Sequence, residues 1–139
     1  MTSPKILVRD HMKSAAYTFA PTTSVEEVVK TLVKNKIIGA PVIDADKKLL
    51  GFITEQDCLK QILNDSYYCE DRQNAEDIMR SNPLSVSPND DIMKLAENMT
   101  QKLPKIYPVV EEGRVIGLIT RHEVLKALSL ARVQVCSTK

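Results

Sequence analysis

Apolar residues along the chain follow two spacings, one helical and one extended, and the two alternate. The first helical stretch carries one apolar stripe, made of Val25, Val28, Val29, Leu32 and Val33. Steps of three and four residues predict an amphipathic helix that buries this face. Two short apolar runs at 40–43 and 49–53, separated by polar turn residues, predict a β-hairpin. A second helix is predicted by the stripe that follows, Cys58, Leu59, Ile62 and Leu63.

The same order of elements returns in the second half of the chain. Its first apolar stripe consists of Ile92, Leu95, Ala96 and Met99. Its hairpin spans 106–110 and 115–119, and its closing helix carries Val124, Leu125, Leu128 and Ala131. Equivalent places hold identical residues, among them Asp10 and Asp77, Met12 and Met79, Pro41 and Pro108, Gly51 and Gly117, and Thr54 and Thr120. We therefore predict one domain of two repeats, about 8–63 and about 75–130, with a polar connector at 64–74.

Each repeat is predicted to run strand, helix, strand, strand, helix. A short extended piece precedes each first helix, at 17–19 and at 84–86. Ser24 and Asp91 stand where these helices begin and are typical N-cap residues. A half of about 55 residues is too small to cover both its sheet and its helices alone. We expect an α+β fold in which two small sheets pack about a pseudo-twofold axis with the helices outside.

Composition and charge disfavour several classes of protein. The chain has 139 residues, 43% of them hydrophobic, and no apolar run is long enough to span a membrane. Its formal net charge of +1 disfavours bulk nucleic-acid binding, although an exposed patch of Arg9, Lys13 and Arg80 would favour it. The three cysteines lack metal-ligand spacing and the two histidines lie far apart, so we expect no metal site. An odd number of cysteines without a secretory pattern predicts a cytoplasmic protein.

Motifs of catalysis are missing from the sequence. It has neither a nucleophile elbow nor a phosphate-binding G-x-x-x-x-G-K-S/T loop, and it contains only four glycines. Cys58 lies in the apolar stripe of a helix, where a free cysteine acts as a small hydrophobe, and we expect a buried, inert thiol. We therefore expect no enzyme activity and no required cofactor.

Three segments of the second repeat, 75–88 (AEDIMRSNPLSVSP), 107–110 (YPVV) and 117–120 (GLIT), resemble a cystathionine β-synthase (CBS) domain. The first repeat resembles it through 40–44 (APVID) and 51–57 (GFITEQD). Together they resemble a CBS pair, or Bateman module, that covers nearly the whole chain. The resemblance implies a stand-alone regulatory module with two clefts for adenosine-containing ligands such as AMP, ADP, ATP or S-adenosylmethionine. It also implies a disc-shaped homodimer that forms through the helices.

The family's ribose motif, a Thr or Ser followed three residues later by Asp, matches Thr54 and Asp57. A carboxylate there can accept hydrogen bonds from both ribose hydroxyls, and the helix N-terminus offers N–H groups to phosphate. The same spacing is also a capping box that needs no ligand. Thr120, Arg121 and Glu123 correspond in the second repeat. Glu123 departs from the family's Asp and favours a structural role, whereas Arg121 suits phosphate.

The resemblance implies that each cleft is shared between the repeats. The cleft of Thr54 and Asp57 would be walled by the second repeat, through Ser85, Lys105, Tyr107 and Pro108. The cleft of Thr120, Arg121 and Glu123 would be walled by the first repeat, through Thr18, Ala40 and Pro41. Lys105 is a candidate phosphate contact. Tyr107, where Leu is more usual, either stacks on adenine or fills the cleft.

The sequence thus predicts a regulatory sensor that binds an adenosine nucleotide between its repeats and acts on an unidentified protein effector. The alternative is a ligand-free dimerisation or protein-interaction module, in which the two Thr-x-x-acid motifs serve only as helix caps. Neither hypothesis involves nucleic acid or a membrane.

Overall fold

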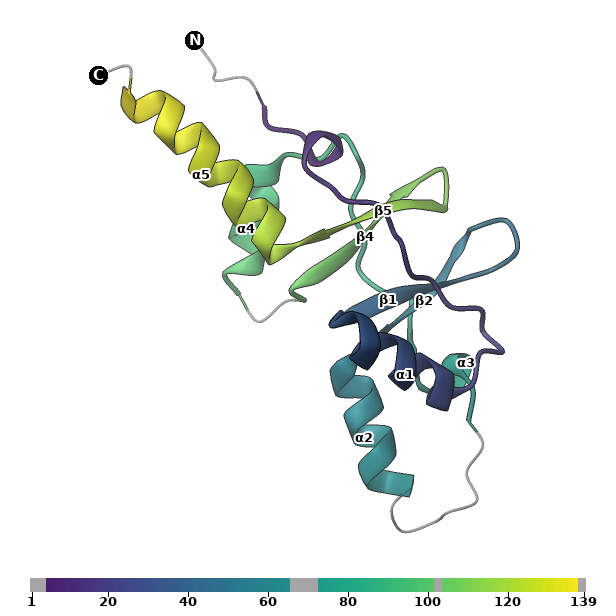
Figure 1. Cartoon of the computed structure of the whole chain (residues 1–139). Coiled ribbons are helices and arrows are strands. Elements are labelled where there is room, and N and C mark those ends of the chain that lie inside the picture. The colour runs from purple at the N-terminus through teal and green to yellow at the C-terminus, as the bar shows by residue number, and fades with distance from the viewer. Residues whose placement is uncertain (1–4, 66–72, 102–103, 138–139) are drawn as a thin grey trace. The chain divides into compact units, whose positions relative to one another are not determined.

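The two helices and the hairpin of each repeat follow one another in the order that the apolar pattern predicts (Figure 1). The computed structural model describes residues 5–65, 73–101 and 104–137. The first repeat contains α1 (Val25–Asn35), β1 (Gly39–Ile43), β2 (Leu49–Thr54) and α2 (Glu55–Asp65). The second contains α4 (Ile92–Met99), β4 (Ile106–Glu111), β5 (Arg114–Thr120) and α5 (Arg121–Ser137). Each repeat therefore carries a hairpin between two helices.

The first helix of each repeat begins at the predicted cap. Ser24 Oγ accepts a hydrogen bond of 3.1 Å from the N–H of Glu27. Asp91 Oδ1 accepts one of 3.0 Å from the N–H of Met93. Each bond satisfies one of the N–H groups that have no partner inside the helix, which fixes where α1 and α4 start.

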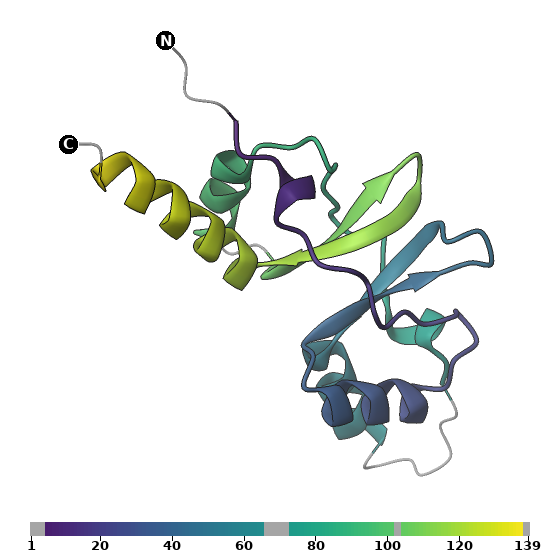
Figure 2. The same cartoon turned by 45° about the horizontal axis from the view of Figure 1, so that its top comes forward.

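Two small antiparallel sheets confirm the α+β class. In the first, β1 pairs with β2 in a register that sets Gly39 opposite Thr54. In the second, β4 pairs with β5. The predicted extended pieces at 17–19 and 84–86 are reduced to single parallel bridges, Phe19 to Val42 and Val86 to Val109. Helices α1 and α2 lie side by side next to the β1–β2 sheet (Figure 2).

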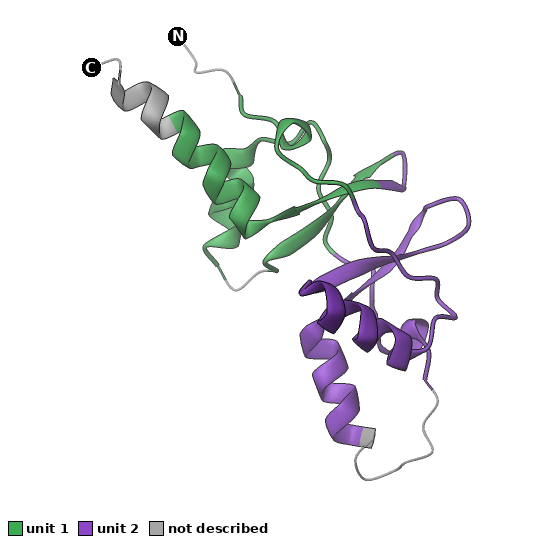
Figure 3. Cartoon of the chain, viewed as in Figure 1, with its two compact units in different colours: residues 1–14, 84–111, 116–139 green, residues 15–83, 112–115 purple. Residues whose placement is uncertain are grey.

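The chain divides into two compact units that differ from the sequence repeats (Figure 3). Unit 1 comprises residues 1–14, 84–111 and 116–139, and unit 2 comprises 15–83 and 112–115. The segment that leads into each repeat, here called its leader, therefore packs on the other repeat. The described part of the first leader is 5–14, with the 3₁₀ turn η1 (Val8–Asp10). The second leader is 73–83, with α3 (Ala75–Ile78) and β3 (Arg80–Ser81). The sequence did not predict η1, α3 or β3.

Each leader contributes a buried side chain to its unit. Val8 lies in the core of unit 1 with Ile92, Val109 and Ile119 among others. Ala75 lies in the core of unit 2, which also contains Phe19, Val28, Leu32, Ala40, Val42, Ile53 and Cys58. Burial of these apolar side chains is the main term that holds a leader in place.

The backbone of each leader lies close to the hairpin of the other repeat. Lys13 and Leu118 exchange N–H···O bonds of 2.9 and 2.8 Å, and β3 pairs with β2 at the equivalent place. A Cβ atom on Gly117 would lie 2.8 Å from the Lys13 carbonyl oxygen and 3.0 Å from Met12 Sδ. A Cβ on Gly51 would lie 2.8 Å from the Arg80 carbonyl oxygen. The matching glycines therefore stand where a leader backbone leaves no room for a side chain.

Several apolar residues of the helical stripes face solvent. Val33, at the edge of the α1 stripe, is 72% exposed. On α2 only Cys58 of the predicted stripe is buried, together with Gln61. Leu59, Ile62 and Leu63 are exposed, and so is Leu125 on α5. Cys58 and Gln61 therefore lie on the inward face of α2, and the remaining apolar residues lie on its outer face. The prediction that the α1 stripe is buried was wrong for Val33, because periodicity finds an apolar arc on a helix but not the surface that covers it.

Replacing Gly117 by alanine is expected to destabilise the fold by about 1–3 kcal/mol, because the new methyl group meets a backbone oxygen that is fixed by pairing. Urea denaturation followed by circular dichroism measures the change. The control is Ile116→Ala, at the exposed neighbouring position in the same strand, which is expected to cost less. A loss for Gly117→Ala no larger than the control's would contradict the close approach.

Candidate functional site

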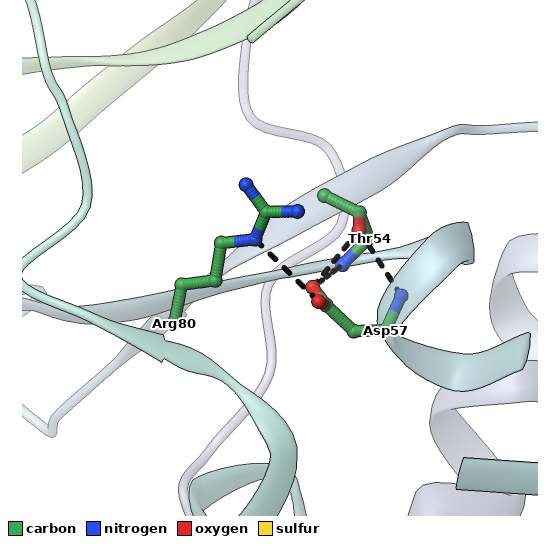
Figure 4. Close-up of polar contacts among 3 residues, drawn as sticks. All are labelled: Thr54, Asp57 and Arg80. Carbon is green, nitrogen blue, oxygen red and sulfur yellow. Dashed lines mark hydrogen bonds and ion pairs between the residues drawn. The ribbon is translucent and has the colours of Figure 1, made fainter. Parts of the chain in front are cut away.

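Thr54 and Asp57 meet where β2 passes into α2 (Figure 4). Asp57 Oδ2 accepts two hydrogen bonds from Thr54, one from its N–H at 2.9 Å and one from Oγ1 at 2.8 Å. The N–H of Asp57 in turn donates to Thr54 Oγ1 at 3.3 Å. One carboxylate oxygen is thus held by the cap. The other oxygen, Oδ1, accepts no bond from Thr54, and a carboxylate oxygen can accept two hydrogen bonds.

Thr120 and Glu123 repeat this arrangement where β5 passes into α5. Glu123 Oε1 accepts from the Thr120 N–H at 3.0 Å and from Thr120 Oγ1 at 2.6 Å. The longer side chain therefore reaches the same two donors that Asp57 reaches in unit 2. Among the described residues, none donates a hydrogen bond to Glu123 Oε2, so this oxygen keeps its full accepting capacity.

A cation from a leader faces each carboxylate. Arg80 Nε lies 3.5 Å from Asp57 Oδ1, and Lys13 Nζ lies 4.0 Å from Glu123 Oε1. The Asp57 side chain is only 11% exposed, whereas that of Arg80 is 50% exposed. Glu123 and Lys13 show the same contrast. Each acid is therefore mostly shielded from water, and each cation is half in solvent.

The sequence placed these cations in equivalent positions but did not assign them to the carboxylates. Lys13 follows Met12 as Arg80 follows Met79, and that repetition was the available signal. Arg9, the third member of the basic patch considered from the sequence, donates to Asn89 Oδ1 and lies 3.9 Å from Glu111. All three cations thus face acidic or amide groups of their own unit.

The first N–H group of each closing helix is already engaged. The N–H of Glu55 donates to the Ile38 carbonyl at 2.9 Å, and that of Arg121 donates to the Lys105 carbonyl at 2.8 Å. The helix starts therefore offer fewer free donors to a phosphate than the sequence implied. The side chains of Arg121 and Lys105 are exposed.

The remaining residues proposed as cleft walls divide into two groups. Ala40, Pro41, Tyr107 and Pro108 are buried, whereas Thr18 and Ser85 are exposed. Tyr107 belongs to the core cluster of unit 1, and burial raises the pKa of its hydroxyl. The carbonyls of Pro41 and Pro108 accept from Phe19 and Val86. Because the walls and the carboxylates of each proposed cleft belong to different units, the shared clefts stay a prediction.

Asp57 also lines an open depression on unit 2 with a volume of about 560 Å³. Its other lining residues are Lys60, Gln61, Leu63, Asn64, Asp77 and Ile78. None of these was proposed from the sequence, because they come from α2 and from the exchanged leader. Within residues 5–65, 73–101 and 104–137, no group of three or more His, Cys, Asp or Glu side chains could hold a metal ion, and no helix could cross a bilayer.

Comparison with known proteins assigns the family. The CBS domain model matches residues 8–64 and 75–130. A CBS domain-containing protein of Dictyostelium discoideum is 30% identical over 135 residues, which cover 89% of this chain and 92% of that protein. This chain therefore belongs to the CBS domain family and consists of a pair of such domains. It spans 42% or less of the first three curated relatives, among them the A-adding tRNA nucleotidyltransferase of Aquifex aeolicus.

Solved structures of CBS pairs share the fold. The crystal structure of CBSX2 in complex with AMP is 27% identical, with a TM-score of 0.81, and the match covers 91% of this chain and 98% of that one. The CBS pair of protein MJ0100, in complex with 5′-methylthioadenosine and S-adenosyl-L-methionine, is 26% identical with a TM-score of 0.76 and the same coverage. The ligands of these two relatives share an adenosine group and differ in charge.

Cys58 follows Asp57 directly and is buried against the core of unit 2, as the sequence predicted. Burial, and then the negative charges of Asp57 and Glu55, raise the pKa of its thiol to about 11. We expect iodoacetamide at pH 8 to label Cys58 about a hundredfold more slowly than an unshielded peptide cysteine, because little thiolate is present.

Peptide mass spectrometry can follow Cys58 separately from the other cysteines. Labelling in urea is the control and should proceed at the rate of a free thiol. Rapid labelling of Cys58 in the native protein would contradict its burial.

Proposed function

We propose that this chain is a regulatory module without catalytic activity that binds an adenosine nucleotide through Asp57 and Glu123. The observation that carries the proposal is the repeated Thr–carboxylate contact at the start of α2 and of α5. In both, one carboxylate oxygen is fixed by threonine and the other can accept hydrogen bonds. A ribose diol offers two hydroxyl donors to such an oxygen pair.

The relatives support the ligand class. One solved CBS pair contains AMP, and another contains 5′-methylthioadenosine and S-adenosyl-L-methionine. In this proposal Ser85, Lys105, Tyr107 and Pro108 complete the Asp57 cleft, and Thr18, Ala40 and Pro41 complete the Glu123 cleft. The bound nucleotide acts as a signal rather than as a cofactor, and its effect passes to an unidentified protein in the cytoplasm.

A ligand-free interaction module is the second candidate, and a specific observation favours it. Asp77 Oδ2 accepts from the Asn74 N–H at 2.8 Å, and Asp90 Oδ2 accepts from the Ser87 N–H at 2.8 Å. In both, a carboxylate accepts from the N–H three residues before it, as Asp57 accepts from the N–H of Thr54, and no ligand is proposed at either place. The backbone cap by itself therefore does not distinguish the two functions, and a binding measurement does.

Asp57→Asn is expected to weaken AMP binding at least about tenfold, because a hydrogen bond to a charged group contributes roughly 1.5–3 kcal/mol. A thermal-shift panel of AMP, ADP, ATP and S-adenosylmethionine first selects the ligand, since saturation at 100 times the dissociation constant adds about 2.7 kcal/mol of stability. Isothermal titration calorimetry then compares the two proteins.

The matched control is Asp44→Asn. Asp44 also accepts hydrogen bonds from backbone N–H groups, those of Asp46 and Lys48. It lies at the turn end of the β1–β2 hairpin, whereas Thr54 lies at the other end. Its loss should leave the affinity unchanged. If no ligand of the panel shifts the wild-type midpoint, the ligand-free module becomes the better account.

We further propose that the outer apolar residues of α2 and α5 form a homodimer interface. Leu59, Ile62, Leu63 and Leu125 are exposed in the single chain, and burying such residues between two copies is favourable. The double variant Leu59→Glu/Leu125→Glu is expected to sediment as a monomer of 15.6 kDa, and the wild type as a dimer.

Val33→Glu on α1 is the control for this measurement. It places a glutamate on an apolar residue that is at least as exposed as Leu59 or Leu125, and it should leave the dimer intact. A wild type that sediments as a monomer at micromolar concentration would remove the interface.

A further inference from the structure

Arg80 holds Asp57 through one donor and has others to spare. Its Nε faces Asp57 Oδ1 at 3.5 Å, and in Figure 4 its two terminal nitrogens point away from the carboxylate. A guanidinium carries five N–H donors in a planar fork that matches the oxygens of a phosphate. Within the described part of the chain, these terminal nitrogens donate no hydrogen bond. The site therefore presents an acceptor and a free bidentate donor side by side.

The place of Arg80 is set by the backbone rather than by the ion pair. In β3, Arg80 stands opposite Phe52 of β2. Residues opposite one another in paired strands share a face of the sheet, and so do residues two apart along a strand. Arg80 therefore emerges on the face that carries Thr54. The close approach at Gly51 fixes this register, so the backbone of Arg80 stays beside β2 whether or not the guanidinium and the carboxylate touch.

We propose that Arg80 makes the Asp57 site selective for phosphorylated adenosine ligands: the carboxylate takes the ribose hydroxyls, and the guanidinium takes the 5′-phosphate. This inference rests on the proposed function and adds the charge of the ligand. A nucleoside 5′-phosphate carries hydroxyl donors and an anion on one sugar, which is the complement of this acceptor–donor pair. A sulfonium at the same position, as in S-adenosylmethionine, would instead bring a second positive charge toward Arg80.

The ion pair between Asp57 and Arg80 is weak enough for a bound phosphate to compete for the guanidinium. Arg80 is half exposed, and the single contact at 3.5 Å is weakened because water screens the guanidinium. A phosphate can therefore recruit the guanidinium at little cost. Removing Arg80 from Asp57 also restores the full accepting capacity of Oδ1 for a ribose hydroxyl.

The equivalent carboxylate in unit 1 shows what the arginine adds. Lys13 occupies the equivalent place, but its ammonium lies 4.0 Å from Glu123 Oε1, an oxygen that already accepts two bonds from Thr120. An ammonium is a point charge without a fork. The two carboxylates of one chain thus have different cationic neighbours, and charge selectivity is assigned to the Asp57 site alone.

Titration of the full chain with AMP and with adenosine, followed by NMR, tests the proposal. The amide resonances of Thr54 and Thr120 report the two carboxylates separately, because each N–H donates to its own acid. At Thr54 we expect the wild type to bind AMP at least about tenfold more tightly than adenosine. Arg80→Gln should abolish this preference by weakening AMP alone, and Arg80→Lys should retain part of it.

Arg9→Gln is the matched control, since it removes the same charge from another half-exposed arginine, which is bonded to Asn89. It should leave the AMP-to-adenosine ratio unchanged. An Arg80→Gln variant with the wild-type ratio, or with equal losses for both ligands, would overturn the selectivity and leave the proposed function standing. A wild type whose Thr54 resonance responds to neither ligand would instead overturn the proposed function, and the selectivity with it.

Discussion

The approach of each leader backbone to a glycine of the opposite repeat is the contact on which the rest of the structure depends. At Gly117 the Lys13 carbonyl lies where a side chain would begin, and at Gly51 the Arg80 carbonyl does. The approach buries Val8 in one unit and Ala75 in the other. It also places the side chains of the same two residues, Lys13 and Arg80, each beside a carboxylate. Stability and the charge of the candidate site therefore have one origin.

Local features of the fold could be predicted from the sequence because they depend on neighbouring residues. The caps at Ser24 and Asp91 and the two hairpins are of this kind. The exchange of leaders could not be predicted in this way. An internal repeat shows that Met12 and Met79 are equivalent, but equivalence does not say on which copy each one packs. Val33 was misplaced for a related reason, since the apolar arc of a helix does not show which surface covers it.

Half of the candidate site was likewise accessible to sequence reasoning. The spacing of Thr54 and Asp57 predicted their contact, and the structure confirms it. Glu123 has one methylene more than Asp57, and it also reaches both Thr120 donors. Rotation about the additional bond absorbs the added length. The cations were not assigned because Arg80 is 23 residues from Asp57 and comes from the exchanged leader.

The two carboxylates share one backbone geometry but differ in electrostatics, and this difference gives a duplicated domain two separate properties. Backbone pairing holds both leaders in equivalent registers, so substitutions at Lys13 or Arg80 change the local charge without moving the strands. A half-exposed cation contributes little to stability. Such a position can therefore vary at small cost to the fold while it changes which ligands the neighbouring acid accepts. Selectivity can diverge between the repeats in this way, whereas Gly51 and Gly117 stay fixed by the space that the leaders leave.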